Sequence, residues 1–417
     1  LSRFTRAESE GLIHKARPGA LLSSEELDRI YDETEGNAFF LMEYVDALGA
    51  DKPFVVTASR MHDVIESKFL DLPDDERKVS EIASLFDGSA PFYVFGELLG
   101  RSPLQVSELV EKLEQRSILE KAPGTRQLSV RFTHRKLREF QYESLSGVKR
   151  NVLHDQVAHI LERRADADPE RIDAYYEIAY HYERANNPAK LLECKIRILS
   201  TNLDYSHERF PIIRYEGKIY DQFDYDDERA SKRVEELEAL LAQVKEEPAD
   251  DADIPSLEMA VLYIRGRYLI RKGDYAPGLA CIDRMMEIAR RLDSVPRLIE
   301  GCRQAILYCL QTQSLDMMEQ YVGYGHRLAQ RSGVPEDEGE FKRYEALLDI
   351  ARGDLDSAER LIDECIRIFS DPTRDSGRFV LYRAACCDEK GNIMRLRGDL
   401  PRALESYRQA IELCEAR

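Results

Sequence analysis

Three short segments of closely similar sequence decide how this chain folds. They are Arg271-Lys272-Gly273-Asp274-Tyr275, Ala351-Arg352-Gly353-Asp354-Leu355 and Leu396-Arg397-Gly398-Asp399-Leu400. Each places Gly-Asp between two stretches with apolar residues at helical spacing, and glycine supplies the backbone freedom that a tight turn between helices needs. The glycines are 80 and 45 residues apart, and a degenerate turn at 313–315 divides the longer interval in two. The sequence therefore predicts four helix–turn–helix repeats over residues 255–417.

The spacing inside each repeat resembles the tetratricopeptide repeat (TPR). In the last repeat, Gly391 stands seven positions before Gly398 and Ala403 five positions after it, and Tyr407 and Ala410 follow at helical spacing. Small residues at such positions let two helices approach closely. The period exceeds the roughly 34 residues of the standard repeat, so longer helices or loops are expected.

An earlier part of the chain carries a looser version of the same pattern. A helix over 174–183, a turn at 186–188 and a helix over 189–199 are followed by a long helical stretch over 228–245. The acidic residues at 246–253 predict a solvated linker. We therefore expect first TPR-like repeats over 150–245 and a TPR-like α-solenoid, an α-α superhelix, through residue 417.

Residues 55–149 follow a different pattern, with helices followed by a hairpin. Helices are expected over 59–70, 74–86 and 103–116. A strand over 117–120, a turn at 122–124 and an alternating strand over 128–132 come next. Three helices and a hairpin are the order of a winged helix. A last helix over 135–145 leads into the repeats, and the predicted fold class is mainly α.

Two motifs resemble STAND-type signal-transduction ATPases, in particular the large LuxR/SARP-like bacterial transcriptional activators that join an ATPase to a TPR-like sensor. They are Thr34-Glu35-Gly36-Asn37-Ala38-Phe39-Phe40-Leu41 and Phe132-Thr133-His134-Arg135-Lys136-Leu137-Arg138-Glu139-Phe140. The resemblance implies that residues 1–52 are the helical lid of such an ATPase, 55–149 its winged helix and the remainder its sensor. Ala38 departs from the pattern, because the family usually has proline there. Leu1 in place of Met and the helical pattern through Glu412 indicate a piece of a longer protein.

His134 is the residue for which the resemblance implies the most specific role. It matches a winged-helix histidine that contacts the β-phosphate of ADP in related switch ATPases; the alternative is a histidine that caps the helix after the hairpin. The lid turn of Thr34, Gly36 and Asn37 is either a purely structural turn or lies close to the nucleotide. Met61-His62-Asp63 has the same letters as the motif that carries this histidine in the plant and animal branches of the family. It lies before the hairpin, however, so we interpret His62 as a surface residue of a helix.

The sequence contains no constellation for catalysis. No G-x-x-x-x-G-K-[ST] occurs in 417 residues, so the chain alone is not expected to be an enzyme or to bind a cofactor, and ATP or ADP would belong to the parent protein. His154 and His159 are five apart and do not share a helix face, so no metal site is expected. The eight cysteines all follow residue 190 without a CxxC pair, which favours reduced core residues.

Charge and hydropathy restrict the partners. A net charge of −18 excludes a broad phosphate-binding surface. No segment approaches the roughly 18 consecutive apolar residues of a membrane span, and no leader opens the chain, so we expect a cytoplasmic protein with no membrane contact.

The leading functional hypothesis is a regulator whose solenoid binds an effector or a protein and controls a nucleotide switch, with DNA bound by a domain outside the chain. TPR geometry predicts a groove for a protein, a peptide or a small anionic effector, and the alternative is an ordinary solvated face. The groove residues would be Tyr263, Arg267, Arg271, Arg303, Arg343, Asn392 and Arg395.

A second hypothesis is direct DNA binding by the winged helix, with the repeats as a docking scaffold. Residues 101–150 hold 11 Lys and Arg against 6 Glu. The expected recognition helix nevertheless carries Glu108, Glu111 and Glu114, which repel phosphates. The same tail could also serve a cyclase or a kinase, whereas a plain scaffold would leave the lid and winged-helix motifs unexplained.

Overall fold

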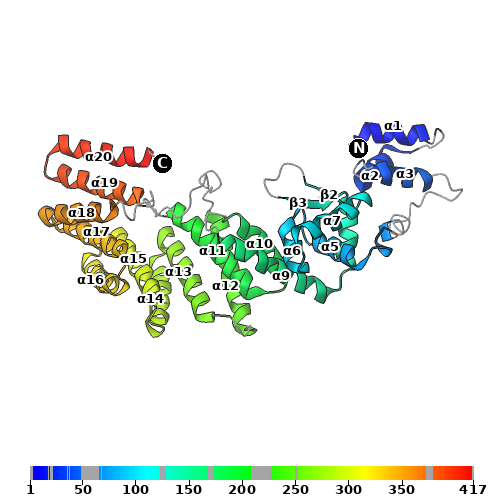
Figure 1. Cartoon of the computed structure of the whole chain (residues 1–417). Helices are drawn as coiled ribbons and strands as arrows, with labels where there is room; N and C mark the ends of the chain where they lie inside the picture. The colour runs from blue at the N-terminus through cyan, green and yellow to red at the C-terminus, as the bar shows by residue number, and fades with distance from the viewer. Residues whose placement is uncertain are drawn as a thin grey trace. The chain divides into compact units, whose positions relative to one another are not determined.

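The computed structural model consists almost entirely of helices (Figure 1). It describes residues 3–16, 18, 22–34, 36, 38–47, 65–66, 68–122, 128–167, 172–207, 227–248, 252–371 and 379–415. The chain divides into two compact units, residues 1–161 with 184–186 and residues 162–183 with 187–417. The first prediction, a mainly helical repeat protein, is confirmed.

Residues 3–47 of the first unit, which we label the lid after the resemblance, contain α1 (Arg6–Ala16), α2 (Ser24–Thr34) and α3 (Ala38–Ala47). Two of these helices begin with reciprocal caps: the Thr5 hydroxyl accepts from the Glu8 amide while the Glu8 carboxylate accepts from the Thr5 amide, and Ser23 and Glu26 do the same for α2. The helices bury a small apolar core made of Ile13, Leu27, Ile30, Leu41 and Val45.

The rest of the first unit has the element order of a winged helix. It runs α5 (Asp74–Ser84), β1 (Ala90–Pro91), α6 (Phe92–Leu99), α7 (Pro103–Gln115), β2 (Leu119–Lys121), β3 (Ser129–Phe132) and α8 (Arg135–Ser144). The strands form an antiparallel sheet in the order β1-β3-β2, with Ala90 opposite Val130 and Leu119 opposite Phe132.

The sequence analysis missed β1 and α6, which the structure inserts between the helices predicted at 74–86 and 103–116. The reason is local: α6 begins Phe-Tyr-Val-Phe, an aromatic and β-branched run without helical periodicity. The helix predicted at 59–70, with His62, and the turn at 122–124 lie largely outside the described residues. The two units divide inside α9 (Gly147–Asp166), later than the boundary predicted at residue 149.

The pair predicted more loosely is α10 (Ala174–Arg184) and α11 (Pro188–His207), which turns at Asn186 with a φ of +56° and lies in the second unit except for residues 184–186. α12 (Asp227–Glu246) follows and packs with α11 and α13 around buried Leu192, Leu237 and Ile264.

Four helix pairs complete the second unit. They are α13 (Ile254–Lys272) with α14 (Tyr275–Arg291), α15 (Val295–Thr312) with α16 (Leu315–Ser332), α17 (Pro335–Arg352) with α18 (Leu355–Phe369), and α19 (Val380–Leu396) with α20 (Leu400–Glu415). The pairs turn where the sequence places them, at Gly273, Gln313, Gly353 and Gly398, with φ of +95°, +55°, +85° and +85°. A left-handed backbone at each turn explains the recurrent glycine.

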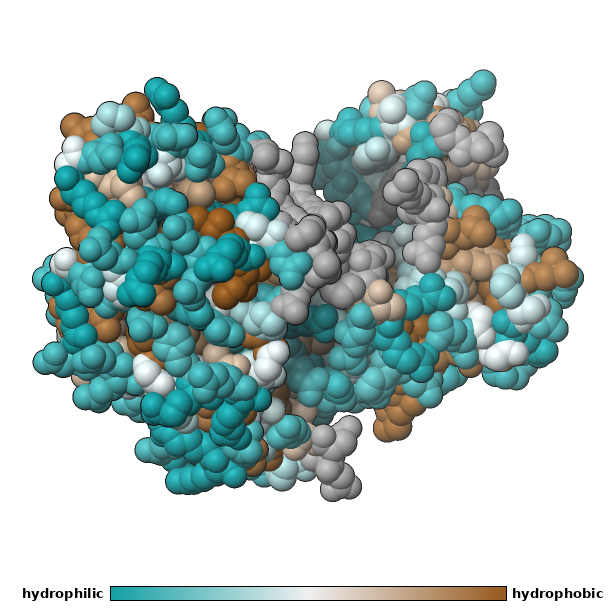
Figure 2. Space-filling model, turned by 60° about the vertical axis from the view of Figure 1, so that its left-hand side comes forward, coloured by the Kyte–Doolittle hydropathy of each residue, from teal (hydrophilic) through white to brown (hydrophobic). Residues whose placement is uncertain are grey.

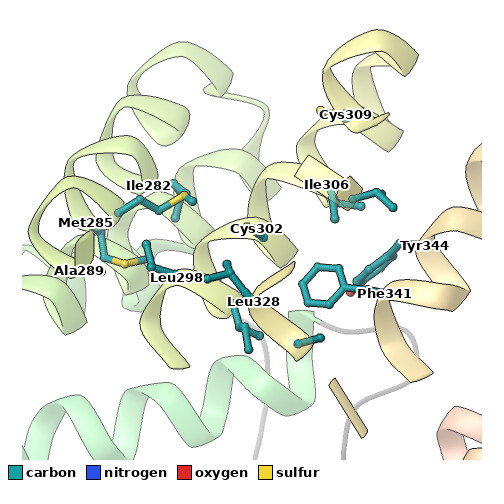
Figure 3. Packing of buried hydrophobic residues seen from close by; sticks show 14 of the residues in the cluster. Ile282, Met285, Ala289, Leu298, Cys302, Ile306, Cys309, Leu328, Phe341 and Tyr344 are labelled. Atoms are coloured by element: carbon teal, nitrogen blue, oxygen red, sulfur yellow. The ribbon is translucent and has the colours of Figure 1, made fainter. Parts of the chain in front are cut away.

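Close packing between successive helices holds the repeats together. Figure 3 shows side chains of neighbouring helices meeting in one layer, with Met285 of α14, Cys302 of α15 and Phe341 of α17 among them. The spacing requires small residues: a Cβ on Gly325 would lie 2.0 Å from the ring of Phe341, and one on Gly391 would lie 2.6 Å from Tyr407. All eight cysteines carry free thiols, and six of them are buried.

Candidate functional site

His134 joins the winged helix to the lid within the first unit. It stands between β3 and α8, where its Nδ1 accepts a hydrogen bond from the Lys136 amide at 3.1 Å and so caps α8. Its Nε2 lies 2.9 Å from the carbonyl oxygen of Thr34, at the end of α2. Because a carbonyl only accepts, Nε2 donates, and the ring is the neutral tautomer with its proton on Nε2. The imidazole is buried, and the ring of Phe40 lies 4.4 Å from it, centre to centre.

The lid turn is held by its own hydrogen bonds, so the Thr34 carbonyl that accepts from His134 has a fixed position. The Thr34 hydroxyl donates back to the carbonyl of Ile30 at 2.7 Å, so it closes the helix end instead of reaching a ligand. Gly36 has a φ of +69°, and a Cβ there would lie 1.9 Å from the carbonyl oxygen of Phe4, whose amide donates to the Gly36 carbonyl at 2.8 Å. Only glycine fits such a turn. Asn37, the third predicted residue, lies outside the described residues.

A second contact fastens the start of the lid to the same loop. Arg3 donates from Nη2 to the carbonyl oxygen of Thr133 at 3.0 Å, and the Thr133 hydroxyl donates to the carbonyl of Ser117 at 2.8 Å. The residue next to His134 thus also bridges the lid and the hairpin. We call the contacts of His134 with Thr34 and of Arg3 with Thr133 the lid latch.

The lid latch leaves no ring nitrogen of His134 for a phosphate. Its Nδ1 caps α8, as the capping interpretation expects, and its Nε2 donates a hydrogen bond to the carbonyl oxygen of Thr34. The sequence holds no P-loop, and the described residues include no group of three or more His, Cys, Asp or Glu side chains that could hold a metal ion. In this arrangement His134 therefore offers no free ring nitrogen to a nucleotide phosphate.

The predicted groove residues divide into three groups in the second unit, and the first is a buried network between the first helices of consecutive repeats. Arg303 of α15 pairs with Asp337 of α17 at 3.0 Å and also with Glu340. The hydroxyls of Tyr344 and Tyr382 donate to the Glu340 carboxylate at 3.0 and 3.2 Å.

Arg343 of α17 extends this network to α19. Its Nη1 lies 2.6 Å from Oε1 of Glu389, and its guanidinium lies 5.5 Å from the ring centre of Tyr344 and 5.8 Å from that of Tyr382. We define the inner network as Arg303, Glu340, Arg343, Tyr344, Tyr382 and Glu389. Burial opposes the charge on both arginines, but Glu340 and Glu389 outweigh it and raise the pKa of each guanidinium.

The second group is Tyr263 and Arg267 of α13. Arg267 is buried, with its guanidinium 5.7 Å from the ring centre of Tyr263, and Gln304 of α15 donates to the Tyr263 hydroxyl at 3.4 Å.

The third group is exposed. Arg271 lies at the surface, and the exposed Arg395 donates to the Asn392 amide oxygen at 2.6 Å. The sequence analysis named the arginines but missed the partners, Glu340 and Glu389. Their signal was a glutamate on the apolar face of a helix, a position that calls for a buried cation.

The basic excess of the winged helix is balanced by carboxylates from elsewhere in the first unit. Lys112 and Arg116 both pair with the buried Glu76, and Lys149 pairs with Glu81. Arg101 and Arg138 also pair with carboxylates outside the 101–150 window, Asp75 and Asp87. The other paired cations, Lys121, Arg131, Arg135 and Lys136, use glutamates of the window itself.

One cavity of about 240 Å³ opens between α10, α11 and α12 in the second unit. The sequence analysis did not find it, because three helices contribute to it. Tyr176 and Tyr180 are among the residues that line it, and so are Lys195 and Glu236, which form an ion pair at 2.5 Å. The remaining lining residues are Ala179, Glu183, Leu191, Ile198, Leu199, Arg233 and Leu237.

Comparison with known proteins identifies the fold. A STAND protein with a tetratricopeptide repeat sensor from Pyrococcus horikoshii matches 99% of this chain with a TM-score of 0.50 at 14% identity, and the chain spans 60% of that structure. BtubC from P. vanneervenii matches 61% of this chain and 91% of its own (TM-score 0.42, 13% identity). Aspartyl phosphate phosphatase F from Bacillus subtilis matches 98% of this chain and 89% of its own (TM-score 0.41, 13% identity). No family model and no curated protein matches the sequence.

Proposed function

We propose that this chain is the regulatory part of a STAND-type signal-transduction ATPase that controls transcription. In this proposal the repeats of the second unit are a sensor for a protein or peptide partner, and the first unit couples that sensor to a nucleotide switch. ATP or ADP would be bound by a P-loop core, and DNA by a further domain, in the parent protein. No catalytic reaction is proposed for the residues of this chain.

The lid latch is the observation that supports this proposal most. The resemblance implies that the histidine after the hairpin contacts the β-phosphate of ADP in related switch ATPases, and here His134 binds the lid turn by its Nε2 at the Thr34 carbonyl. The two motifs that carry the resemblance are thus in direct contact although 100 residues separate them. A neutral histidine whose one donor can bond to one acceptor at a time is suited to a two-state contact.

The structure favours a protein or peptide partner over a small anion for the repeats. Arg303 and Arg343, two of the five predicted groove arginines, are already paired with Glu340 and Glu389, so an anionic effector that binds them would have to replace a buried carboxylate. The cavity of α10, α11 and α12 is lined mainly by aliphatic and tyrosine side chains, which suit an apolar side chain of a peptide.

Direct DNA binding by α7 is the weaker alternative. Glu76 offsets part of the charge of Lys112 and Arg116, and Glu108, Glu111 and Glu114 on α7 repel phosphates. DNA contact is therefore assigned to a domain outside the chain.

The nucleotide switch is tested in the parent protein with the variant His134→Asn. Asparagine keeps an oxygen that can cap α8 but is too short to reach the Thr34 carbonyl. Nucleotide bound to the purified parent protein is released by denaturation and quantified. We expect bound ADP in the natural protein and at least tenfold less after equal dialysis of the variant. A parent without nucleotide, or a variant that retains ADP equally, contradicts the proposal.

A further inference from the structure

Two arginines of the second unit, Arg290 of α14 and Arg327 of α16, meet at one aromatic ring. The guanidinium carbon of Arg290 lies 5.9 Å from the centre of the Tyr324 ring, and that of Arg327 lies 5.6 Å from it. Both arginines are exposed, whereas Tyr324 is partly buried against the apolar core of the repeats. Two positive charges from different helices therefore share one small patch of surface.

The described residues provide no carboxylate partner for either guanidinium. Neither Arg290 nor Arg327 forms a salt bridge with any of them. Two carboxylates on α14 and directly after it have other partners. Asp283 accepts a hydrogen bond from a tyrosine hydroxyl of α16 at 3.4 Å, and Asp293 accepts from Arg331 at 2.8 and 3.0 Å. The positive charge of the patch is therefore not neutralised within the described chain.

The missing partner distinguishes this patch from the ordinary charged surface. Hydrophilic side chains, in teal, cover most of the surface visible in Figure 2, so a charged side chain by itself marks no site. Many arginines of the repeats have an acidic partner, as Arg352 has in Glu319. The dipole of a helix favours positive charge in its last turn, which accounts for Arg290, but Arg327 lies before the last turn of α16.

The next repeat shows which group the patch lacks. Tyr324 and Arg327 are the tenth and thirteenth residues of α16, and the same places in α18 are Glu364 and Arg367. A hydrogen bond from Lys342 at 2.6 Å and, more weakly, the charge of Arg367 lower the pKa of Glu364. The repeat of α18 thus supplies its own carboxylate near the arginine. In α16 a tyrosine takes the place of that carboxylate.

The chemistry of the patch suits an oxyanion. A guanidinium carries five N–H donors in a planar fork that matches a carboxylate, and contact with the Tyr324 ring does not use these donors for hydrogen bonds. Open space borders Arg327, because a Cβ on Gly323 would have only the end of the Arg327 side chain within 4 Å, at 3.9 Å. An acidic group from outside can therefore reach the arginines.

We propose that Arg290, Arg327 and Tyr324 form a docking site for a carboxylate side chain in an acidic segment of a protein or peptide partner. We call these three residues the arginine patch. The inference rests on the proposed role of the repeats as a sensor for such a partner. A nucleic acid fits less well, because a row of phosphates would meet the exposed Asp283 and Glu287 of α14 and a chain with a net charge of −18.

Binding of an acidic probe to the full chain tests the arginine patch. The probe is a rhodamine-labelled peptide of four glutamates, and fluorescence anisotropy at low salt measures its affinity. One test variant combines Arg290→Gln with Arg327→Gln, and the other, Tyr324→Glu, gives α16 the carboxylate that α18 has. The matched control combines Arg360→Gln with Arg408→Gln, two exposed arginines of α18 and α20 whose loss changes the net charge equally.

We expect both test variants to weaken peptide binding roughly tenfold or more, because hydrogen bonds to charged groups are lost. The control should bind like the natural chain, and circular dichroism checks that each variant is folded. A natural chain that does not bind the peptide, or a control that loses as much affinity as the test variants, overturns the proposal. These results leave the ADP measurement on the parent protein, and with it the nucleotide switch, unaffected.

Two competitors identify other occupants. A labelled single-stranded DNA that binds more tightly than the peptide and depends on Arg290 and Arg327 would overturn the proposal in favour of a nucleic acid. Displacement of the peptide by inorganic phosphate at a lower concentration than by unlabelled peptide would overturn it in favour of a small phosphate ligand.

Discussion

Removing the carboxylate of Glu389 should destabilise the second unit far more than removing that of an exposed glutamate. The Arg343 and Glu389 side chains are 15% and 11% exposed, and their ion pair at 2.6 Å connects α17 with α19. Glu389→Ala leaves a guanidinium buried among tyrosine rings, with its Nε already lacking a hydrogen-bond partner. An uncompensated buried charge costs about 3–5 kcal/mol.

Urea unfolding of the full chain, followed by circular dichroism, measures this cost. The double variant Arg343→Met with Glu389→Leu replaces the pair by apolar side chains of similar size, so its stability should return to within about 1–2 kcal/mol of the natural chain. The control is Glu319→Ala, whose pair with Arg352 is exposed and should be worth less than about 1 kcal/mol.

Two results would refute this reasoning. If Glu389→Ala and Glu319→Ala lose the same stability, the network is an ordinary solvated face. If the double variant is as unstable as Glu389→Ala, the loss comes from packing and not from a charge left without its partner.

Three further predictions concern packing, pH and thiols. Gly325→Ala should destabilise the second unit by about 1–3 kcal/mol, because its methyl group would lie 2.0 Å from an aromatic ring of α17. Gly323→Ala on the same helix should stabilise it by up to about 1 kcal/mol, because only the end of one side chain lies within 4 Å of that position. Equal shifts of the thermal midpoint in the two variants would contradict this prediction. Burial lowers the pKa of His154 to about 4, so between pH 6.5 and 4 the unfolded chain binds a proton at this residue and the folded chain does not. The first unit should therefore lose stability as the pH falls through this range, and urea titrations at each pH should show a smaller loss in His154→Gln. Equal pH profiles of the two proteins would exclude His154 as the source of the loss. Burial raises the pKa of the Cys302 thiol to about 12, whereas Cys414 is exposed. A thiol-reactive label at pH 8 should therefore modify native protein quickly at Cys414 and not at Cys302. Peptide mapping that finds both cysteines labelled alike would show that the core is open to the reagent.

The helix pairs could be predicted from the sequence because each turn is a local event. Gly353 adopts a positive φ, and the Asp354 carboxylate after it caps the next helix by accepting from the Ser357 amide at 3.0 Å. Both residue types are therefore local signals of a turn that can be recognised in the sequence. Gln313 adopts the same conformation without glycine, and only the repeat period revealed it.

The candidate sites could be predicted only in part because their partners are distant in sequence. Glu389 lies on the apolar face of its helix, which indicates that a cation must pair with it, but only the stacking of α17 on α19 shows that this cation is Arg343. Likewise, no local pattern connects His134 with a carbonyl group 100 residues earlier. The charge around the basic window of the winged helix could not be judged from that window alone for the same reason, since Glu76 lies outside it and still pairs with two of its residues.

Hydrogen exchange of the lid tests the central claim, that His134 holds the lid to the winged helix. The full chain is compared with His134→Asn and with Lys136→Ala, a neighbouring change that leaves the backbone amide bonded to His134 in place. Losing a buried hydrogen bond costs about 1–3 kcal/mol, so amides of α2 and α3 should exchange roughly 5- to 150-fold faster in His134→Asn and at the natural rate in Lys136→Ala. Unchanged exchange of α2 and α3 in His134→Asn would contradict the lid latch.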